Sequence, residues 1–302
     1  MWTADNWKDY KVIDCTDGEK LERWGDYLLV RPDPQVIWQT GHKNPAWKKV
    51  NGHYHRSTKG GGEWDFRDLP KEWTIKYDLT PAGKKLCFHL KPFAFKHTGI
   101  FPEQAVNWDW ASEHIVRAGR SKNAEGSDSR VRVLNLFAYT GGATVSAAVS
   151  GAFVTHVDAA KGMVGWAKEN AESSNCGHDS IRWIVDDCLK FVEREIRRGN
   201  TYDAIIMDPP SYGRGPGGEV WKIEDAVFPL ICKASELLSD KPLFFLINSY
   251  TTGLQPAVLS YMLNTALTAK RGGHVESSEI GLPIEGSDTL ILPCGASGRW
   301  VP

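Results

Sequence analysis

The chain has 302 residues, of which 41% are hydrophobic and 24% charged, and its formal net charge is −1. This balance is that of a globular protein; it excludes general disorder, and the net charge by itself predicts no nucleic-acid partner. No run of 18 apolar residues occurs, and the first ten residues lack the basic and then apolar order of a secretory signal, so we expect a cytoplasmic protein that is not embedded in a membrane.

The cysteines are scattered and include no Cys-x-x-Cys pair, which argues against a zinc site and against a disulfide framework. We therefore expect six reduced thiols and no bound metal, at Cys15, Cys87, Cys176, Cys188, Cys232 and Cys294.

Residues 1–96 are predicted to form a β-rich N-terminal domain. Short apolar runs over 10–15, 27–38 and 73–91 alternate with turn residues, and Thr-Pro-Ala-Gly at 80–83 indicates a hairpin. This segment holds 17 basic and 13 acidic residues, whereas 97–302 holds 19 and 24. The two segments thus differ in the sign of their net charge.

The positive charge is concentrated between Asp33 and Glu63, where no acidic residue occurs. Cations next to flat rings are what an RNA-binding surface requires, because cations attract phosphates and rings stack on bases. A solvated loop beside a tryptophan-rich core is the alternative interpretation. We call the following residues the basic stretch: Arg31, just before this interval, and Lys43, Lys48, Lys49, Arg56 and Lys59 within it, interleaved with Trp38, Trp47, Tyr54 and three histidines.

From residue 131 onward, strands and helices alternate, which predicts a doubly wound, mostly parallel sheet with helices on both faces. A polar linker or exposed loop over 119–130 precedes it, after a helix over 108–118. We expect seven strands, over 131–138, 153–159, 180–187, 202–208, 242–249, 274–282 and 288–294. Ligands of such sheets bind beyond the carboxyl ends of the strands.

The first of these strands runs through Tyr139 and Thr140 into Gly141 and Gly142. Glycines allow unusual dihedrals and close approach of the backbone, and the following helix offers free N–H groups to a ligand. A plain tight turn is the alternative. The pattern does not fit Gly-x-Gly-x-x-Gly, so a dinucleotide site is poorly supported.

Carboxylates follow the next two strands. Asp158 stands where a nucleotide site places an acid on ribose hydroxyls, and Asp186 or Asp187 is suited to accept from an adenine amino group. Each of these aspartates could equally cap the helix that follows it.

The fourth strand ends in Asp208-Pro209-Pro210-Ser211-Tyr212. Prolines donate no N–H, so this turn is predicted to present carbonyls and a carboxylate as acceptors, with the Tyr212 ring available for stacking. The glycine-rich residues 213–218 predict a mobile loop that could close over a substrate. A strand terminator without further function is the alternative.

The segments "VLNLFAYTGGATVSAAVSGA", "HVDAAKGMVGWAKEN", "WIVDDCLKF" and "DAIIMDPPSYGRGP" resemble the successive motifs of class I S-adenosylmethionine-dependent methyltransferases. They are most similar to the group that methylates bacterial large-subunit ribosomal RNA. "HTGIFPEQAVNW" (97–108) is similar to the segment before that group's core. The resemblance covers residues 97–302 and implies a Rossmann-like methyltransferase domain with S-adenosylmethionine as the cofactor.

The resemblance also implies roles for individual residues. The ribose would be held by Asp158 and the adenine by Asp187, with Phe101 and Gln104 flanking the pocket. Asp208, Pro209 and Tyr212 would face the methyl group and its acceptor, with Ser211 and Ser249 as further substrate contacts beside the cations Lys48, Lys49, Arg56 and Lys59. The methionine part of the cofactor would be surrounded by Asn135, Phe137, Tyr139, Thr140, Gly141 and Gly142.

The sequence departs from the pattern of cytosine-5 methyltransferases, which need a cysteine nucleophile. The loop after the fifth strand reads "LINSYTTG" (246–253), and the Asp-Pro-Pro loop also lacks a cysteine. A hydroxyl is a far weaker nucleophile than a thiolate. We therefore expect methylation of a nitrogen on an RNA base, which Asp208 and the Pro209 carbonyl would hold by its N–H.

Three other functions stay open at this point. The enzyme could methylate a protein or a small molecule, or it could be a nicotinamide-dependent oxidoreductase, which the missing Gly-x-Gly-x-x-Gly disfavours. It could also be a non-catalytic RNA-binding protein with a methyltransferase fold.

Overall fold

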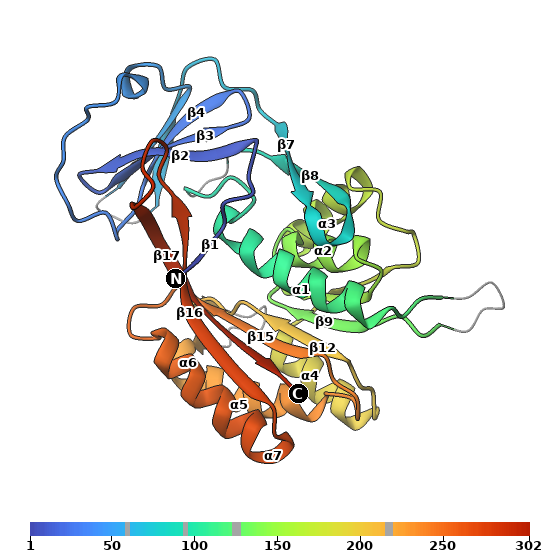
Figure 1. Cartoon of the computed structure of the whole chain (residues 1–302). Helices are drawn as coiled ribbons and strands as arrows, with labels where there is room; N and C mark the ends of the chain where they lie inside the picture. The colour runs from blue at the N-terminus through green and yellow to red at the C-terminus, as the bar shows by residue number, and fades with distance from the viewer. Residues whose placement is uncertain (58–60, 93–95, 123–127, 215–219) are drawn as a thin grey trace.

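An eight-stranded sheet with helices on both faces organises the C-terminal two-thirds of the chain (Figure 1). The structure is a computed structural model that describes residues 1–57, 61–92, 96–122, 128–214 and 220–302. The strand order is β1-β16-β17-β15-β12-β9-β10-β11. The strands span Trp2–Thr3 (β1), Arg132–Leu136 (β9), Phe153–Asp158 (β10), Ile181–Val185 (β11), Ala204–Met207 (β12), Phe244–Ser249 (β15), His274–Pro283 (β16) and Ile291–Val301 (β17).

The predicted doubly wound, mostly parallel sheet is confirmed. Strands β15, β12, β9, β10 and β11 are parallel, and β17 is antiparallel to both of its neighbours. The chain builds β9, β10 and β11 outward in one direction and then returns to place β12 on the other side of β9. This reversal between β9 and β12 is the switch point at which such sheets bind ligands.

Seven of the eight strands match the expected ones, with two differences at the far edge. Strand β17 continues to Val301, beyond the expected end at Cys294. The eighth strand, β1, comes from the N-terminal segment and pairs parallel to β16, with Trp2 opposite Ile280. The pattern of a two-residue strand is too short to detect in the sequence.

Helices cover both faces of this sheet (Figure 1). On one face lie α1 (Ala105–Ala118), α2 (Gly142–Val149) and α3 (Lys161–Ser173). The other face is covered by α4 (Cys188–Arg197), α5 (Ile223–Glu236) and α6 (Pro256–Leu263), which continues as a π-helical turn (Asn264–Thr268) into α7 (Ala269–Arg271).

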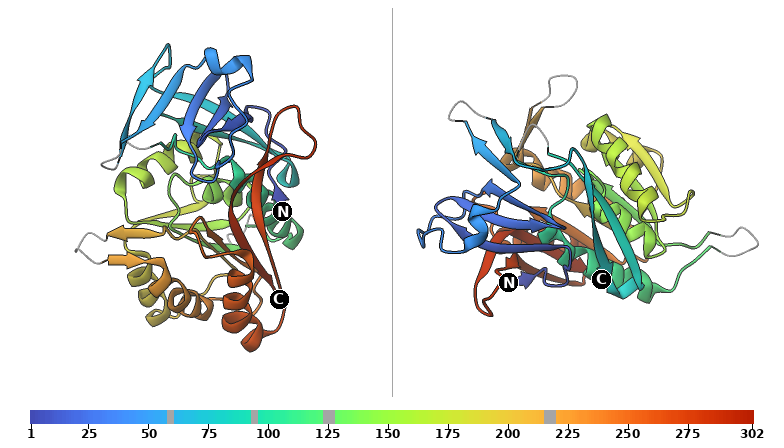
Figure 2. Two further views of the ribbon diagram at one scale, coloured as in Figure 1. Left: turned by 90° about the vertical axis from the view of Figure 1, so that its left-hand side faces the viewer. Right: turned by 90° about the horizontal axis from the view of Figure 1, so that it is seen from above.

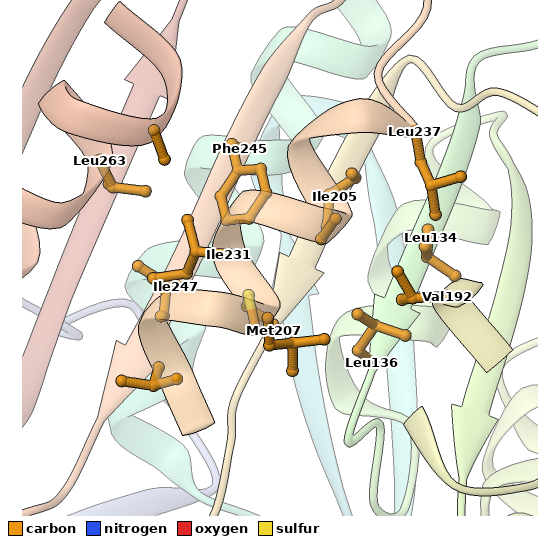
Figure 3. Packing of buried hydrophobic residues seen from close by; sticks show 14 of the residues in the cluster. Leu134, Leu136, Val192, Ile205, Met207, Ile231, Leu237, Phe245, Ile247 and Leu263 are labelled. Carbon is orange, nitrogen blue, oxygen red and sulfur yellow. The ribbon is translucent and has the colours of Figure 1, made fainter. Parts of the chain in front are cut away.

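The alternation of side chains along each strand builds the core between the sheet and α4 to α6. Figure 3 shows the side chains of two residues from each central strand pointing into this layer against Val192, Ile231, Leu237 and Leu263. Each such side chain stabilises the fold by about 1.5–3 kcal/mol when it is fully buried. The strand residues are Leu134, Leu136, Ile205, Met207, Phe245 and Ile247.

The N-terminal segment forms a five-stranded sheet, which lies beyond one end of the large sheet (Figures 1 and 2). Its strands, in order, are β2 (Tyr10–Thr16), β3 (Glu19–Trp24), β4 (Tyr27–Pro32), β5 (Gly52–Arg56) and β6 (Gly62–Phe66). A 3₁₀ turn (Pro45–Lys48) lies between β4 and β5.

The expected hairpin is present as β7 (Trp73–Leu79) and β8 (Lys84–Leu90), joined through Thr80–Ala82 and Gly83, which has a φ of 60°. Among the described residues, neither strand of this hairpin pairs with the eight-stranded sheet or with the five-stranded sheet. The backbone N–H of His89 donates to Asn170 on α3 over 2.8 Å, so the hairpin is packed against helices of the C-terminal segment. The division at residue 96 remains a prediction.

Some expected features fall partly outside the described residues. These are Lys59, residues 123–127 of the expected 119–130 loop and residues 215–218 of the expected 213–218 loop. Gly213 belongs to a short strand, β13 (Tyr212–Arg214), which pairs with β14 (Val220–Lys222). Over the described residues, no helix combines the length and the apolar character needed to cross a bilayer.

Candidate functional site

A cavity of about 410 Å³ lies at the carboxyl ends of the parallel strands. Turns after β9, β10, β11, β12 and β15 line it, together with the segment that leads into α1. The topology thus brings together the strand ends that the sequence singled out. Of the expected site residues, those in the lining are Phe101, Gln104, Asn135, Phe137, Tyr139, Thr140, Gly142, Asp158, Asp187, Asp208, Pro209 and Ser211.

The turn after β9 presents two aromatic side chains to the cavity from an unusual backbone. Phe137 has a φ of 55° and Tyr139 a φ of 51°, and neither is a glycine. This left-handed conformation costs an ordinary residue roughly 1–2 kcal/mol. Residues in such conformations cluster at functional sites, where the surrounding structure holds them in place.

The two glycines of this turn are required mainly by packing. Gly141 has a φ of 84°, and a Cβ there would lie 2.9 Å from the Ala167 Cβ on α3. Gly142 begins α2, and a Cβ there would lie 2.7 Å from the Trp108 ring. Gly141 does not line the cavity, so the tight-turn interpretation accounts for this position.

Asp158 and Asp187 both border the cavity, and both bind backbone amides. The carboxylate of Asp158 accepts from the N–H groups of Tyr139 and Ala160, each over 2.8 Å. Asp187 accepts from the Lys190 N–H over 2.9 Å and so caps α4. The helix-cap interpretation is therefore correct for Asp187, whose position in the lining also keeps it accessible to a ligand. Asp186 instead forms an ion pair with Arg194.

Asp208 is the carboxylate nearest the middle of the sheet. Burial, with a smaller contribution from the negative charge of Glu103, raises its pKa to about 7. No cation pairs with Asp208 among the residues that the structure describes. A partly buried carboxylate without a counter-ion is a suitable environment for a cationic group of a ligand, such as a sulfonium or an ammonium.

The residues after Asp208 separate into two faces. Gly213 and Trp221 are opposite each other in the β13–β14 pair, and both line the cavity. Tyr212 is opposite Lys222, is 53% exposed and is not part of the lining. The structure therefore brings Trp221, rather than Tyr212, to the cavity wall.

Trp221 occupies one of the two proline carbonyls that we expected to be free acceptors. Its indole N–H donates to the Pro210 carbonyl over 2.6 Å, and its ring centre lies 5.2 Å from that of Phe137. Among the described residues no donor is paired with the Pro209 carbonyl. Pro209 and Asp208 thus remain as acceptors at this turn.

The end of β15 follows the two-residue alternation of a strand. Asn248 and Tyr250 line the cavity, whereas the Ser249 side chain is turned away and is only 2% exposed. The Ser249 hydroxyl accepts from the Thr251 N–H over 3.2 Å. The structure does not bring Ser249 to the site where we expected a substrate contact.

One cysteine, Cys188, lines the cavity within the described part of the chain. Its sulfur accepts from the Phe137 N–H over 3.2 Å, and burial raises the pKa of the thiol well above its usual value. A thiol that stays protonated is a poor nucleophile.

The basic stretch of the N-terminal sheet is only partly available to a ligand. Lys48, Lys49 and Arg56 are exposed, but none lines the cavity. Arg31 is buried and forms two hydrogen bonds to Glu22, of 2.6 and 2.7 Å. The structure therefore removes Arg31 from the expected RNA-binding cations.

The rings of this stretch are also engaged in internal contacts. The indole of Trp47 donates to Asp14 over 2.8 Å, and that of Trp38 donates to the Cys15 carbonyl over 2.9 Å. His53 lies 2.7 Å from the Glu19 carboxylate. These partly buried rings are thus bound within the N-terminal sheet, which favours the alternative interpretation for them.

Sequence reasoning missed several residues of the lining, among them His97, Trp221, Asn248 and Tyr250. The strand alternation through 244–249 already placed Asn248 and Ser249 on opposite faces, and so offered a signal for Asn248. Trp221 reaches the cavity through the β13–β14 pairing, in a segment that the sequence predicts as a loop. No periodicity of the sequence indicates that pairing.

Comparisons with known proteins agree with this geometry. A family model described as S-adenosylmethionine-dependent methyltransferase matches residues 85–239. The chain is also similar to a solved structure from Agrobacterium tumefaciens that is described as an S-adenosylmethionine-dependent methyltransferase. The two are 35% identical, the similarity covers 99% of this chain and 92% of the other, and the TM-score is 0.89.

Curated relatives match over shorter shares of their length. The ribosomal RNA large subunit methyltransferase K/L of Vibrio campbellii is 41% identical over 136 residues, which are 45% of this chain and 17% of that protein. A Methanocaldococcus jannaschii protein, provisionally named a ribosomal RNA large subunit methyltransferase, is 39% identical over 228 residues, 74% of this chain and 52% of its own. The chain thus spans about a sixth of the first relative and about half of the second.

The family model and the Agrobacterium structure confirm the Rossmann-like methyltransferase fold and the expected cofactor, S-adenosylmethionine. The cavity residues fit this cofactor, since the partly buried Asp208 carboxylate in the lining suits its positive charge. The chain belongs to the S-adenosylmethionine-dependent methyltransferase family.

Proposed function

We propose that the protein transfers the methyl group of S-adenosylmethionine to a nitrogen on a base of RNA, with ribosomal RNA as the substrate. The observation that carries the proposal is the convergence of five strand ends on one cavity that contains Asp208 and Pro209. The names of the Vibrio and Methanocaldococcus relatives support ribosomal RNA. Such a substrate also implies a cytoplasmic location.

The cofactor would occupy the side of the cavity formed by β9, β10 and β11. Asp158 would accept from the ribose hydroxyls, and Asp187 from the adenine amino group. The turn 135–142 would surround the methionine part, with Phe101 and Gln104 at its flank. S-adenosylmethionine supplies an electrophilic methyl group on a positively charged sulfur.

Asp208 and the Pro209 carbonyl would hold the N–H groups of the acceptor base. Holding the nitrogen in line with the methyl group is the main contribution of the protein, and such alignment contributes up to roughly 7–11 kcal/mol. With a pKa of about 7, the Asp208 carboxylate is also suited to receive the proton that the nitrogen loses.

Cytosine C5 is disfavoured as the acceptor atom because its methylation needs a thiolate in the site. Cys188 is the cysteine of the described lining, and its thiol is buried with a raised pKa. Lys48, Lys49 and Arg56 would bind phosphates of the RNA from the N-terminal sheet.

The test is incubation of the protein with labelled S-adenosylmethionine and undermodified ribosomal RNA, followed by nucleoside analysis. We expect a labelled N-methylated nucleoside. Labelled 5-methylcytidine would contradict the nitrogen acceptor. Label in protein or small molecules, but in no nucleoside, would contradict RNA as the substrate.

A further inference from the structure

A chain of hydrogen bonds, buried except at its last link to Tyr250, leads from Arg299 on β17 to the cavity. The guanidinium lies 3.7 Å from the centre of the Trp2 ring, and its Nε and Nη2 lie 3.1 and 2.6 Å from the Asn107 Oδ1. Burial lowers the pKa of Arg299 only to about 9, so the group stays charged at neutral pH. Because a guanidinium can only donate, the Asn107 oxygen must face it and the Asn107 amide nitrogen must point the other way.

The orientation of Asn107 fixes that of Gln104. The Asn107 Nδ2 donates to the Gln104 Oε1 over 2.9 Å, so the nitrogen of Gln104 faces away from Asn107. That nitrogen lies 2.7 Å from the Tyr250 hydroxyl oxygen. An amide NH₂ can only donate, and the Tyr250 oxygen therefore accepts this bond.

The same reasoning fixes Asn248. Its Oδ1 accepts from the Ser297 hydroxyl over 2.7 Å and lies 3.0 Å from the Asn107 Nδ2. The two hydrogens of that Nδ2 are shared among the Asn248 Oδ1, the Ser297 Oγ at 2.9 Å and the Gln104 Oε1. The Nδ2 group of Asn248 is left, as is the hydroxyl hydrogen of Tyr250. Neither has an acceptor among the described residues, and both residues line the cavity. Tyr250 is 36% exposed, and its partial burial together with the negative charges of Glu103 and Asp208 raises the pKa of its hydroxyl, which stays protonated.

We propose that Tyr250 and Asn248 are fixed hydrogen-bond donors of the methyl-acceptor site, set beside the acceptors Asp208 and Pro209. The proposal rests on the function proposed above. The sheet order supports the acceptor side, because β15 lies on one side of β12 while the strands expected to bind the cofactor lie on the other. The substrate class is a nucleobase that carries an exocyclic amino group next to a ring nitrogen or carbonyl.

This donor and acceptor pattern discriminates among bases. Adenine, cytosine and guanine each offer an amino group to Asp208 and Pro209 and a neighbouring acceptor to Tyr250 or Asn248. Uracil has no amino group. A site built to bind a polar group rejects a ligand that lacks it, because buried polar atoms would be left unpaired.

The test is Tyr250→Phe, which keeps the ring and removes only the hydroxyl. We expect kcat/KM for ribosomal RNA to fall about tenfold, as for the loss of one hydrogen bond, while the Kd of S-adenosylmethionine changes less than twofold. Gln104→Glu should give a similar loss, because a carboxylate would accept the Tyr250 proton and withdraw it from the cavity. Tyr261→Phe, at a tyrosine that is 75% exposed on α6, is the matched control and should leave both values unchanged.

Wild-type kcat/KM in active Tyr250→Phe, or a loss confined to cofactor affinity, would overturn the inference. If the wild-type protein itself does not methylate RNA, the proposed function fails instead. The donor pattern is then tested by binding of CMP and UMP to the protein with S-adenosylhomocysteine. A preference for CMP that Tyr250→Phe reduces supports the pattern, and equal binding of the two nucleotides contradicts it.

Discussion

The carboxyl end of the large sheet and the basic stretch of the N-terminal sheet offer a comparison between two regions that the sequence marked as functional. At the sheet end, nearly all of the expected cofactor-binding residues line one cavity. In the basic stretch, Arg31 is buried against Glu22, and Trp38 and Trp47 hydrogen-bond inside the N-terminal sheet. Lys48, Lys49 and Arg56 remain exposed.

The difference lies in what fixes the side chains. Residues at the ends of neighbouring parallel strands meet because the topology requires it. The partners of a cation-rich stretch come from other strands, and composition within the stretch does not reveal them. Three acids that precede the stretch in the chain each form a hydrogen bond with one of its residues. The pairs are Glu22 with Arg31, Asp14 with Trp47 and Glu19 with His53.

The largest expected effect is at the sheet end. Asp208→Ala should lower kcat for methyl transfer about 10³-fold, because the acceptor nitrogen loses both its partner and its proton acceptor. Single-turnover methylation of RNA measures this, with far-UV circular dichroism to verify folding. Asp240→Ala, at an exposed aspartate outside the cavity, is the control. Wild-type rates in Asp208→Ala would support a binding protein with an inactive methyltransferase fold.

The next effect concerns stability and contrasts two cations of the basic stretch. Arg31→Ala should lower the free energy of unfolding by about 3–5 kcal/mol, since it removes the nearer of the two cations paired with the buried Glu22 carboxylate and leaves only Lys20, 3.7 Å away, among the described residues. Lys49→Ala should change it by less than about 0.5 kcal/mol. Urea denaturation measures both. Equal effects would mean that the two cations do not differ in role as the structure indicates.

A smaller effect follows from the raised pKa of Asp208, about 7 in the folded protein. The folded state holds this proton more tightly than the unfolded state, so the carboxyl stabilises the fold at low pH and loses that contribution as the pH rises to about 7. Compared with wild type, Asp208→Asn should therefore gain about 1–3 kcal/mol of unfolding free energy between pH 4 and pH 8. Denaturation at both pH values measures the gain, and a difference between Asp208→Asn and wild type that is the same at the two pH values would contradict it.

The smallest effect is expected at the exposed cations. Reversing Lys48, Lys49 and Arg56 to glutamate should raise the KM for RNA several-fold and reduce its dependence on salt, with no change in cofactor affinity. Lys270→Glu, an exposed lysine on α7, is the control. An unchanged KM would mean that these cations of the N-terminal sheet do not bind RNA. Of the two regions compared, the large sheet alone would then have a function in catalysis.

The sequence predicted the strand order along the chain, the β7–β8 hairpin and most of the cavity lining, because periodicity and turn residues are local signals. It wrongly placed Tyr212 and Ser249 at the substrate. Adjacent residues of a strand point to opposite faces, and here the neighbours Gly213, Asn248 and Tyr250 line the cavity instead. The side that faces the cavity depends on pairing partners such as Val220–Lys222. Tyr250 acquires its orientation through Gln104, Asn107 and Arg299, which are distant in sequence.

Strand β1 has a consequence for how the protein can be divided. Residues 2–3 pair with β16, and Val12 of the N-terminal sheet pairs with Ile284 just beyond it. The outer rim of the large sheet is thus covered at Ile280, Gly281 and Ile284 by the segment that the sequence assigns to another domain. A fragment of residues 97–302 would expose unpaired strand backbone along β16, and exposed edges of this kind promote self-association. The N-terminal segment therefore supplies part of the rim of the large sheet, even where the sequence suggests a boundary.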